Sequence, residues 1–510
     1  MKRFIFALSF GLLAGSNSHA AITPSGSFLS DTRICTLGSG QAVCSVTVRF
    51  EKSDTDLACV WSTRPTSKNK VWCTAQPTFT GTWSSTSYVG HTLELRAHET
   101  TTEPSNNNAG YETGLPLDTI FVQATGPDTN RVKTLDPGDD IQAALDTVSS
   151  YGGGIVWLNT GEYVLPDPPN EKEFLQIPSN VSLRGTGTKP ANTRLTMDEC
   201  PGTGLCNNRA LIRIKDAGNV YLENFKFKGE ADLFPESTRL NNIRRGMVIK
   251  NCTGPVTLRD IEMRKISRAG MVGKSCTAGT VSFIGIDVRK IGYANFLSGG
   301  QIVQDQAFVM GGTDGSGNET PMEGVLLRDS NFLHSDPNEE RGRDGTVSFV
   351  NSNTITVSET SSVGATSGAI YFVNTHDAVI RGNTLNDTTE FGIDIVDGSS
   401  ALRFEDNTVS GNEAAGGTIA RGPASTPQRC PTDIVMDNND FSGGNGTAGS
   451  VFRCDNDNNN PSLKVDGMLI IPGMVETTSQ SAAASTQYGF YVTDQWCDWD
   501  PAYNPNPTCP

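Results

Sequence analysis

Two pairs of basic residues, Arg264-Lys265 and Arg289-Lys290, recur 25 residues apart, each after a run of alternating apolar residues. The runs read VTLRDIEMRKIS and VSFIGIDVRKIG. Fixed positive charges bind carboxylate or sulfate groups through charge-assisted hydrogen bonds, and a lysine crowded by other cations has a lowered pKa and can take up a proton. The two pairs therefore predict a site for an acidic ligand.

The segment that carries these pairs is strongly basic, although the chain as a whole is acidic. The formal net charge of the 510 residues is −16, and such a chain is not expected to bind nucleic acid. Between residues 239 and 290, however, eleven basic residues stand against three acids. So few compensating acids favour a binding surface over a solvated charged face. The basic residues are Arg239, Arg244, Arg245, Lys250, Arg259, Arg264, Lys265, Arg268, Lys274, Arg289 and Lys290.

A second group of residues suited to chemistry is acidic. The run TTEFGIDIVDGSS brings Glu390, Asp394 and Asp397 close together in the sequence, and in a strand Asp394 would face outward between Ile393 and Ile395. Paired carboxylates hydrolyse glycosidic bonds, and carboxylates also ligate Ca²⁺. These acids predict hydrolysis as the alternative chemistry and Ca²⁺ as the one cofactor to consider. No organic cofactor is expected.

Both groups lie among short strands that recur every 20 to 30 residues from about residue 130 to residue 494. A unit of that length cannot bury its own apolar face, so consecutive copies must stack as a solenoid. Because each copy is strand and turn without a helical half, the all-β fold expected is a parallel β-helix. Ile141, Ala144, Leu145 and Val148 recur at helical spacing before the first strands and predict a capping helix. The strand-like runs are NVYLENFKFKG, PVTLRDIEMRKI, TVSFIGIDVRKI, GVLLRDSNFLHS, HDAVIRGNTLND, SALRFEDNTVSG and TDIVMDNNDFSG.

One rung per 25 residues would stack the two basic pairs. Arg264 would lie beneath Arg289, and Lys265 beneath Lys290, so that the pairs form a ladder along the solenoid. Like charges at the spacing of neighbouring strands repel one another. An acidic ligand is therefore expected to occupy this ladder.

The next strands extend the same alignment. Matching apolar positions puts Phe332 over Val288, which places His334 over Lys290. The following rung would then put Leu385 over Phe332. On this alignment the imidazole of His334 continues the basic ladder.

The succession of short strands after a helical cap resembles the right-handed, pectin-lyase-like β-helix superfamily over about residues 130–500. Polysaccharide lyases with this fold commonly use Lys or Arg as the base, often with Ca²⁺ to neutralise the substrate carboxylate. The resemblance implies that Lys265 or Lys290 is the base and that Tyr293 or His334 is the acid. The arginines implied in substrate binding are Arg264, Arg268, Arg289, Arg244 and Arg245.

An extended basic groove on such a fold predicts an acidic polysaccharide as the partner, bound across several rungs. If the polymer is a uronan, β-elimination is the reaction that depends most on cations, because the C5 proton is weakly acidic until the neighbouring carboxylate is neutralised. A base then removes that proton while an acid assists the leaving oxygen. Two alternatives stay open. One is a hydrolase of the galacturonan or carrageenan type, although the Asn-Thr-Asp and Gly-His-Gly motifs of polygalacturonase-like hydrolases are absent. The other is a non-catalytic glycan-binding adhesin.

The twelve cysteines, with no CxxC motif, predict disulfides rather than thiol chemistry or a zinc site. Cys252 and Cys276 are separated by 24 residues, as are Cys430 and Cys454, which is close to one rung. Neighbouring strands lie ~4.8 Å apart, a distance that a disulfide can span, so each pair should bridge adjacent rungs. The other expected partners are Cys35 with Cys44, Cys59 with Cys73, Cys200 with Cys206, and Cys497 with Cys509.

The two ends of the chain differ from the solenoid. Residues 1–20 read as a secretory signal peptide, which places the protein in the periplasm or the medium. Residues 21–125 contain short alternating strands and resemble bacterial immunoglobulin-like accessory domains, with Trp61, Trp72 and Trp83 expected in the core rather than on a sugar-binding face. Residues 501–510 are expected to form a C-terminal tail. No segment after the signal peptide is apolar enough to span a membrane. The protein is expected to be a monomer.

Overall fold

The computed structural model describes most of the chain between residues 25 and 493. The described residues are 25–29, 33–38, 41, 43–53, 55–64, 67–85, 88–98, 100–166, 173–197, 210–229, 245–266, 269–291, 296–298, 301–303, 307–312, 318–333, 347–364, 368–386, 391–396, 398–410, 415–421, 432–440, 450–453, 463–465, 468–470 and 490–493. The predicted signal peptide and C-terminal tail lie outside these ranges.

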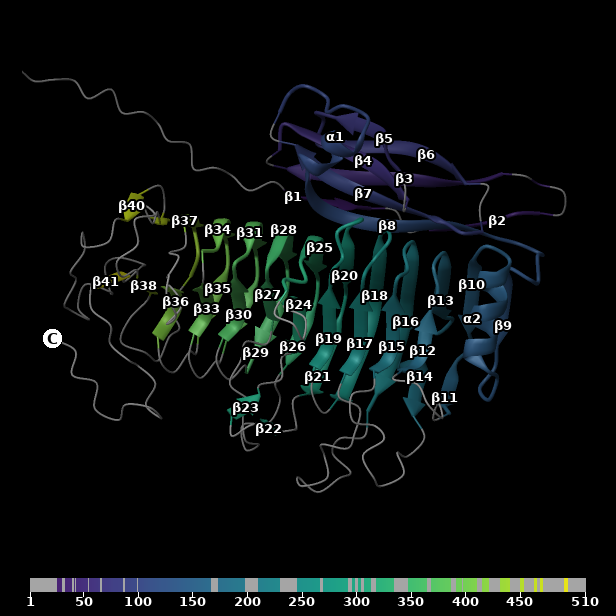
Figure 1. Ribbon diagram of the computed structural model, residues 1–510. Coiled ribbons are helices and arrows are strands. Elements are labelled where there is room, and N and C mark those ends of the chain that lie inside the picture. Colours follow the sequence, from purple (N-terminus) through teal and green to yellow (C-terminus); the bar gives the residue numbers. More distant parts are fainter. Residues whose placement is uncertain are drawn as a thin grey trace, which may run out of the picture.

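The first eight strands form a β-sandwich, drawn in purple and blue in Figure 1. Alternation builds its core: in the strand Cys44–Ser53, Val46, Val48 and Phe50 are buried, and the residues between them are exposed. One sheet has the order β1 (Ser25–Phe28), β3 (Cys44–Ser53), β6 (Thr78–Ser85). The other has the order β2 (Ile34–Thr36), β8 (Leu115–Thr125), β7 (His91–His98), β4 (Leu57–Arg64), β5 (Ser67–Thr74), and the short helix α1 (Asn108–Glu112) precedes β8.

A strand and a helix close the start of the second domain. They are β9 (Val132–Leu135) and α2 (Ile141–Ser150). The carboxylate of Asp140 caps α2 by accepting a hydrogen bond from the Ala143 N–H at 3.0 Å, which satisfies a backbone donor without a partner in the helix. The apolar side chains that predicted this helix are all buried, which confirms it: Ile141, Ala144, Leu145 and Val148.

After the cap, the chain coils through three stacks of parallel strands around one continuous apolar core, which confirms the predicted parallel β-helix (Figure 1). The first stack comprises β10 (Gly154–Leu158), β13 (Val181–Gly185), β16 (Val220–Lys228), β18 (Val256–Ile266), β20 (Val281–Ile284), β25 (Met322–Arg328), β28 (Ser352–Ser358), β31 (His376–Arg381), β34 (Ser400–Glu405), β37 (Thr432–Asp437) and β39 (Leu463–Val465). The second comprises β11 (Gly161–Leu165), β14 (Thr193–Met197), the second halves of β16 and β18, β21 (Asp287–Ile291), β26 (Asn331–Leu333), β29 (Ser361–Val363), β32 (Thr384–Asn386) and β35 (Thr408–Ser410). The third comprises β12 (Glu173–Ile177), β15 (Ala210–Lys215), β17 (Arg245–Lys250), β19 (Ala269–Lys274), β24 (Phe308–Gly311), β27 (Val347–Val350), β30 (Gly368–Val373), β33 (Phe391–Val396), β36 (Ala415–Arg421), β38 (Ser450–Arg453) and β41 (Phe490–Thr493). Shorter elements are the 3₁₀ turn η1 (Pro190–Asn192), the antiparallel pair β22 (Phe296–Ser298) and β23 (Gln301–Val303), and β40 (Met468–Ile470), which is antiparallel to β39.

Several strand-like runs of the sequence pass through two stacks, because the backbone turns at a single residue. Asn224 within β16, Asp260 within β18 and Gly285 between β20 and β21 all have a positive φ, near +50° to +64°. Asn, Asp and Gly adopt this left-handed conformation more readily than other residues. The residues before each corner therefore belong to the first stack, and the residues after it belong to the second.

The expected placement of Leu385 directly over Phe332 is wrong, because a further rung lies between them. Phe332 pairs with Ser362 of β29, and Ser362 pairs with Leu385 of β32. This rung begins with SNTITVS in β28. Serine and threonine stand there at positions where the other rungs have apolar residues, so the alternating apolar pattern is weak. The other alignment, Phe332 over Val288, is confirmed.

Three of the expected disulfides lie in the described part of the chain, and all three are formed. They are Cys35–Cys44, Cys59–Cys73 and Cys252–Cys276. The last links adjacent rungs after β17 and β19, with a Cα–Cα distance of 4.6 Å. The other six cysteines lie outside the described residues: Cys200, Cys206, Cys430, Cys454, Cys497 and Cys509.

The β-sandwich lies along the first stack of the β-helix, where β8 packs against β25 and β28 (Figure 1). In the described ranges, no helix has the length and apolar character needed to cross a membrane.

Candidate anion-binding site

The register of the second stack places cations directly above one another. Lys228 of β16 pairs with Arg264 of β18, and Arg264 pairs with Arg289 of β21, which confirms the predicted stacking of the two arginines. Adjacent strands lie ~4.8 Å apart, so the three charges follow the axis of the β-helix at that spacing. Leu333 of β26 ends the series. We call Lys228, Arg264 and Arg289 the cation column.

Acidic side chains on the same strands offset part of this charge. Oε1 of Glu262 lies 2.9 Å from Nζ of Lys226 and also pairs with Nε of Arg264. Asp287 accepts a hydrogen bond from Nε of Arg289 at 2.6 Å, and this bond raises the pKa of Arg289. The repulsion expected from the sequence is therefore reduced, and the acids orient the guanidinium groups. The two arginine side chains remain 38% and 39% exposed, which leaves them accessible to a ligand.

The other predicted residues of this site are described only in part. Lys265 and Lys290 follow the two stacked arginines on adjacent rungs, and only their backbone is described. Arg245 begins β17 in the third stack, where it pairs with Ala269, so it is not part of the cation column. The remaining candidates lie outside the described residues: Arg244, Arg268, Tyr293 and His334.

The third stack carries a second series of stacked cations. Lys215 of β15 pairs with Lys250 of β17, and Lys250 pairs with Lys274 of β19. Nζ of Lys215 lies 3.3 Å from a carboxylate oxygen of Asp216. The sequence contains a signal for this series, because the runs ALIRIK, RGMVIK and AGMVGK all end in lysine. We call Lys215, Lys250 and Lys274 the lysine column.

The described part of the acidic run, Phe391–Val396, belongs to the third stack. Asp394 lies in β33 between Ile393 and Ile395, which are buried, and it pairs in register with Tyr371 of β30. The side chain of Asp394 is outside the described part, as are Glu390 and Asp397. No group of three or more His, Cys, Asp or Glu residues within the described ranges is arranged to hold a metal ion. No calcium ligand set can therefore be assigned there, and Ca²⁺ stays a prediction.

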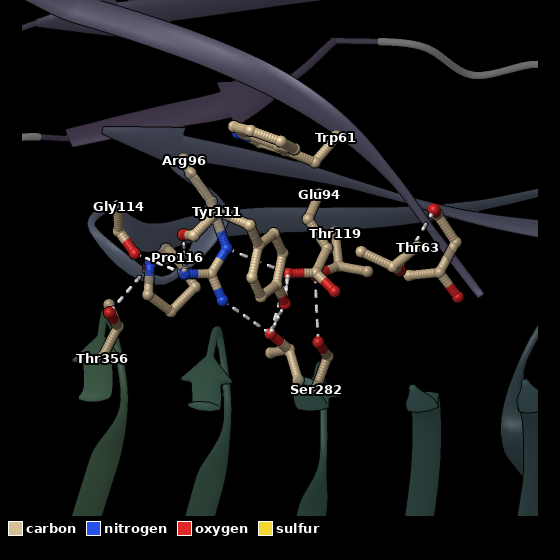
Figure 2. A network of polar contacts seen from close by, with 12 residues as sticks. Trp61, Thr63, Glu94, Arg96, Tyr111, Gly114, Pro116, Thr119, Ser282 and Thr356 are labelled. Atoms are coloured by element: carbon tan, nitrogen blue, oxygen red, sulfur yellow. Dashed lines mark hydrogen bonds and ion pairs between the residues drawn. The ribbon is translucent and has the colours of Figure 1, made fainter. Parts of the chain in front are cut away.

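Trp61 occupies the core position expected for it, whereas Trp72 and Trp83 are only partly buried. Trp61 is fully buried, and Trp72 and Trp83 pack against the apolar core of the sandwich. Figure 2 shows Trp61 beside Tyr111, in a network of polar contacts at the boundary between the two domains. Trp61 therefore cannot stack on a sugar.

Residues 195–431 match a family described as "Right handed beta helix region". The second domain has the fold of a right-handed parallel β-helix. Solved structures with a similar shape include the A-module of mannuronan C-5 epimerase AlgE4 from Azotobacter vinelandii, at 15% identity and a TM-score of 0.40, covering 65% of this chain and 92% of that one. Another is PfbA, a surface adhesin of Streptococcus pneumoniae, at 13% identity and a TM-score of 0.45, covering 65% and 86%.

A third similar structure is endopolygalacturonase I from Stereum purpureum, at 15% identity and a TM-score of 0.38, covering 65% of this chain and 89% of that one. No curated protein matches the sequence. A shared β-helix does not by itself select an activity. The function of this chain therefore depends on its own residues.

Proposed function

We propose that this β-helix protein is a secreted enzyme that cleaves an acidic, uronate-containing polysaccharide by β-elimination. The cation column carries the proposal, because it aligns three positive charges with the axis of the β-helix at a spacing of one rung. A linear polyanion lying along the axis would meet a cation on each of three successive rungs. The two exposed arginines are held in place by Glu262 and Asp287, so little side-chain ordering is required when they bind a carboxylate.

The reaction needs a neutralised carboxylate, a base and an acid. In our proposal Arg264 and Arg289 bind the uronate carboxylate and stabilise the negative charge that develops as the C5 proton leaves. Lys265 or Lys290 takes that proton, and Tyr293 or His334 protonates the departing O4. The C4–O4 bond breaks, and its loss leaves a C4–C5 double bond. No water, oxidant or organic cofactor is consumed.

The unsaturated product gives a direct test. The purified protein would be incubated with alginate, pectate, glycosaminoglycans and ulvan, each with and without Ca²⁺, while ultraviolet absorbance is followed. A rise in absorbance supports the lyase, and dependence on added Ca²⁺ would indicate that the metal takes part. An absence of new double bonds on every polymer, combined with new reducing ends, would refute β-elimination.

Substitutions then assign the roles. Lys265→Ala or Lys290→Ala should lower kcat by about 100-fold or more if that lysine is the base. Arg264→Gln and Arg289→Gln should each lower kcat/KM about tenfold or more, through loss of a charged hydrogen bond to the carboxylate on which negative charge develops. Arg381→Gln is the control, because Arg381 lies on the first stack, with its guanidinium 3.4 Å from Asp406 and away from the column. Full activity in all four variants, at Arg264, Lys265, Arg289 and Lys290, would exclude this site.

A second candidate, hydrolysis of an anionic polysaccharide, is favoured by the third stack. Asp394 and Tyr371 lie opposite one another there, and the lysine column lies on earlier rungs of the same stack. A reducing-end assay that includes carrageenans would detect this activity, and Asp394→Asn should abolish it. If neither double bonds nor reducing ends form, direct binding to the same polymers would support the adhesin.

A further inference from the structure

The contact between the two domains contains a buried ion pair that belongs entirely to the β-sandwich. Glu94 and Arg96 project from β7 toward the β-helix and are 0% and 2% exposed. Oε2 of Glu94 accepts hydrogen bonds from Nε of Arg96 at 3.2 Å and from the hydroxyl of Tyr111 at 2.6 Å (Figure 2). Because the β-helix covers this pair, the pair cannot exchange these contacts for water while the domains are docked.

From the β-helix, the side chain of Thr280 joins this network. The hydroxyl of Thr280 donates to Oε2 of Glu94 at 2.8 Å and accepts from Nη2 of Arg96 at 3.0 Å. It also lies 2.9 Å from the hydroxyl of Tyr111. Nη1 of Arg96 donates to the carbonyl groups of Tyr111 and Gly114, within the β-sandwich. Thr280 is therefore the described β-helix residue that hydrogen-bonds to both members of this buried pair.

No neighbouring rung could replace Thr280. Val281 pairs with Val256 below and Val325 above, so the positions equivalent to Thr280 are Pro255 and Gly324. Neither residue has a polar side chain. A displacement of the β-sandwich by one rung would leave Glu94 and Arg96 buried without that hydrogen bond, which is strongly unfavourable for charged groups.

The charged contacts across the boundary also favour the observed position of the β-sandwich over a position displaced by one rung. Arg33 pairs with Glu223 at 2.9 Å, and the residues above and below Glu223 in the stack are Arg259 and Arg184. A displacement in either direction would thus set Arg33 against an arginine. Asp118 pairs with Arg328 at 3.1 Å, and the equivalents of Arg328 are Ile284 and Ser358.

Two hydroxyl contacts add to this selectivity. Thr356 donates to the carbonyl group of Pro116 at 2.7 Å, and its rung neighbours Leu326 and Val379 have no donor in their side chains. The hydroxyl groups of Thr119 and Ser282 lie 2.9 Å apart. The neighbours of Ser282 are Thr257, which could substitute for it, and Leu326, which could not.

We propose that the N-terminal β-sandwich is a register key: it docks on the β-helix at one rung position only and remains fixed there. Apolar rungs resemble one another, so burial alone distinguishes poorly between docking positions one rung apart. Polar contacts supply that distinction, because most of them lose their partner when the β-sandwich is displaced by one rung. The partner of this surface of the β-sandwich is therefore the chain's own first stack, and the inference does not depend on the proposed enzymatic function.

Cross-linking between paired cysteines tests the register in the full-length protein. In the variant Thr119→Cys/Ser282→Cys, the two sulfur atoms would lie close enough to bond. Thr119→Cys/Thr257→Cys and Thr119→Cys/Leu326→Cys are the matched controls for docking one rung lower and one rung higher. After oxidation, non-reducing peptide mapping should find at least about tenfold more of the first cross-link than of either control. Comparable yields from all three pairs would overturn the proposal.

A second measurement tests the key itself. Thr280→Val, added to the Thr119→Cys/Ser282→Cys variant, should lower the yield of the cross-link and speed amide hydrogen exchange in β7 and β8, and Thr280→Ser should restore both. Thr375→Val is the control, because Thr375 is equally buried but donates only to carbonyl groups within the β-helix. If Thr280→Val and Thr375→Val behave alike in both measurements, Thr280 is not a key and the proposal fails.

Discussion

In the described part of the chain, three arginines stand two residues after an acid on the same strand, and their surroundings give them different roles. Glu94 with Arg96 and Glu262 with Arg264 share this spacing and an ion pair, as Asp287 does with Arg289. Arg96 is enclosed between two domains, where its contacts can only hold the domains together. The arginines of the cation column are partly exposed and can bind a ligand. The spacing in the sequence is the same, so burial alone separates the structural pair from the candidate site.

His98 gives a prediction about pH at the scale of one residue. Burial, with the positive charges of Arg96 and Lys70, lowers the pKa of His98 to about 4, against about 6.5 in an unfolded chain. Between these values the unfolded chain binds the additional proton, so stability is lost as the pH falls from about 6.5 to 4. His98→Gln should remove up to about 3 kcal/mol of this pH dependence, measured by denaturant unfolding at pH 7 and pH 4.5.

The contribution of His98 is the difference in pH dependence of the free energy of unfolding between the parent protein and His98→Gln. The pKa values of Asp118 and Asp260 are raised by burial, so these groups make the folded protein more stable as the pH falls, opposite to His98. They remain in His98→Gln and cancel in the difference. His376→Gln serves as the control, because His376 is only partly buried and its Nδ1 contacts the hydroxyl of Ser400. An equal pH dependence in the parent and His98→Gln would contradict the prediction.

At the scale of the strand and its turn, buried asparagines stack along the corner between the first and second stacks. Asn383, Asn407 and Asn439 follow one another on successive rungs and are each 1% exposed. The side-chain amide of Asn407 donates to the carbonyl of Ile380 at 2.9 Å and to Oδ1 of Asn439 at 2.7 Å. Its own Oδ1 accepts from the side-chain amide of Asn383 at 2.9 Å. The ladder thus satisfies polar groups that the corner buries.

Asn407→Asp should be strongly destabilising despite its nearly identical shape. A carboxylate at this position cannot donate to the two oxygen atoms that Asn407 contacts, and it would be buried without a cation. We expect a loss of about 3 kcal/mol in the free energy of unfolding at pH 7. Burial raises the pKa of such a group, so part of the loss should be recovered at pH 4, where the acid is protonated and can donate. A loss that is the same at both pH values, in denaturant titrations, would argue against this account.

The disulfide Cys252–Cys276 gives a second prediction for the rungs. It closes a loop of 24 residues between adjacent rungs. Replacement of both cysteines by serine should lower the free energy of unfolding by about 3 kcal/mol, chiefly because the unfolded chain regains entropy. The same replacement at Cys59 and Cys73, which closes a shorter loop of 14 residues, should cost somewhat less. Thermal unfolding of both variants would check the order, and a larger loss at Cys59 and Cys73 would contradict it.

The sequence predicted the repeated strands more completely than the way they are joined. Alternation of apolar residues, with the capping helix at Ile141–Ser150, was sufficient for the β-helix and for the stacking of Arg264 on Arg289. The rung that begins at Ser352 was missed because serine and threonine dilute its apolar pattern. The corners were missed because a single Asn, Asp or Gly inside a strand-like run does not reveal a change of sheet. The lysine column could have been found from its shared final lysine. Thr280, by contrast, contacts Glu94 and Arg96 from another domain and leaves no local signal beside them.

For the whole molecule, the position of the β-sandwich decides which surfaces of the β-helix can meet a polymer. It covers part of the first stack, as Figure 1 shows, with contacts that run from Arg33–Glu223 to Pro116–Thr356. The cation column lies on the second stack, and the lysine column lies on the third. Along the covered rungs, a ligand that follows the axis can reach the second and third stacks, which carry the two candidate sites.

The same arrangement predicts that the β-sandwich and the rungs it covers unfold together. Their boundary buries the Glu94–Arg96 pair and Asp118, which would lose partners if one domain separated while the other remained folded. Hydrogen exchange during a thermal ramp should give peptides from β7 and β8 the same midpoint as peptides from β20 and β25. Arg328→Ala removes the partner of Asp118 and should lower the shared midpoint by several degrees, as expected for a loss of about 2 kcal/mol or more. Two well-separated midpoints in the parent protein would mean that the domains are energetically independent, and that the contacts at their boundary contribute little to its stability.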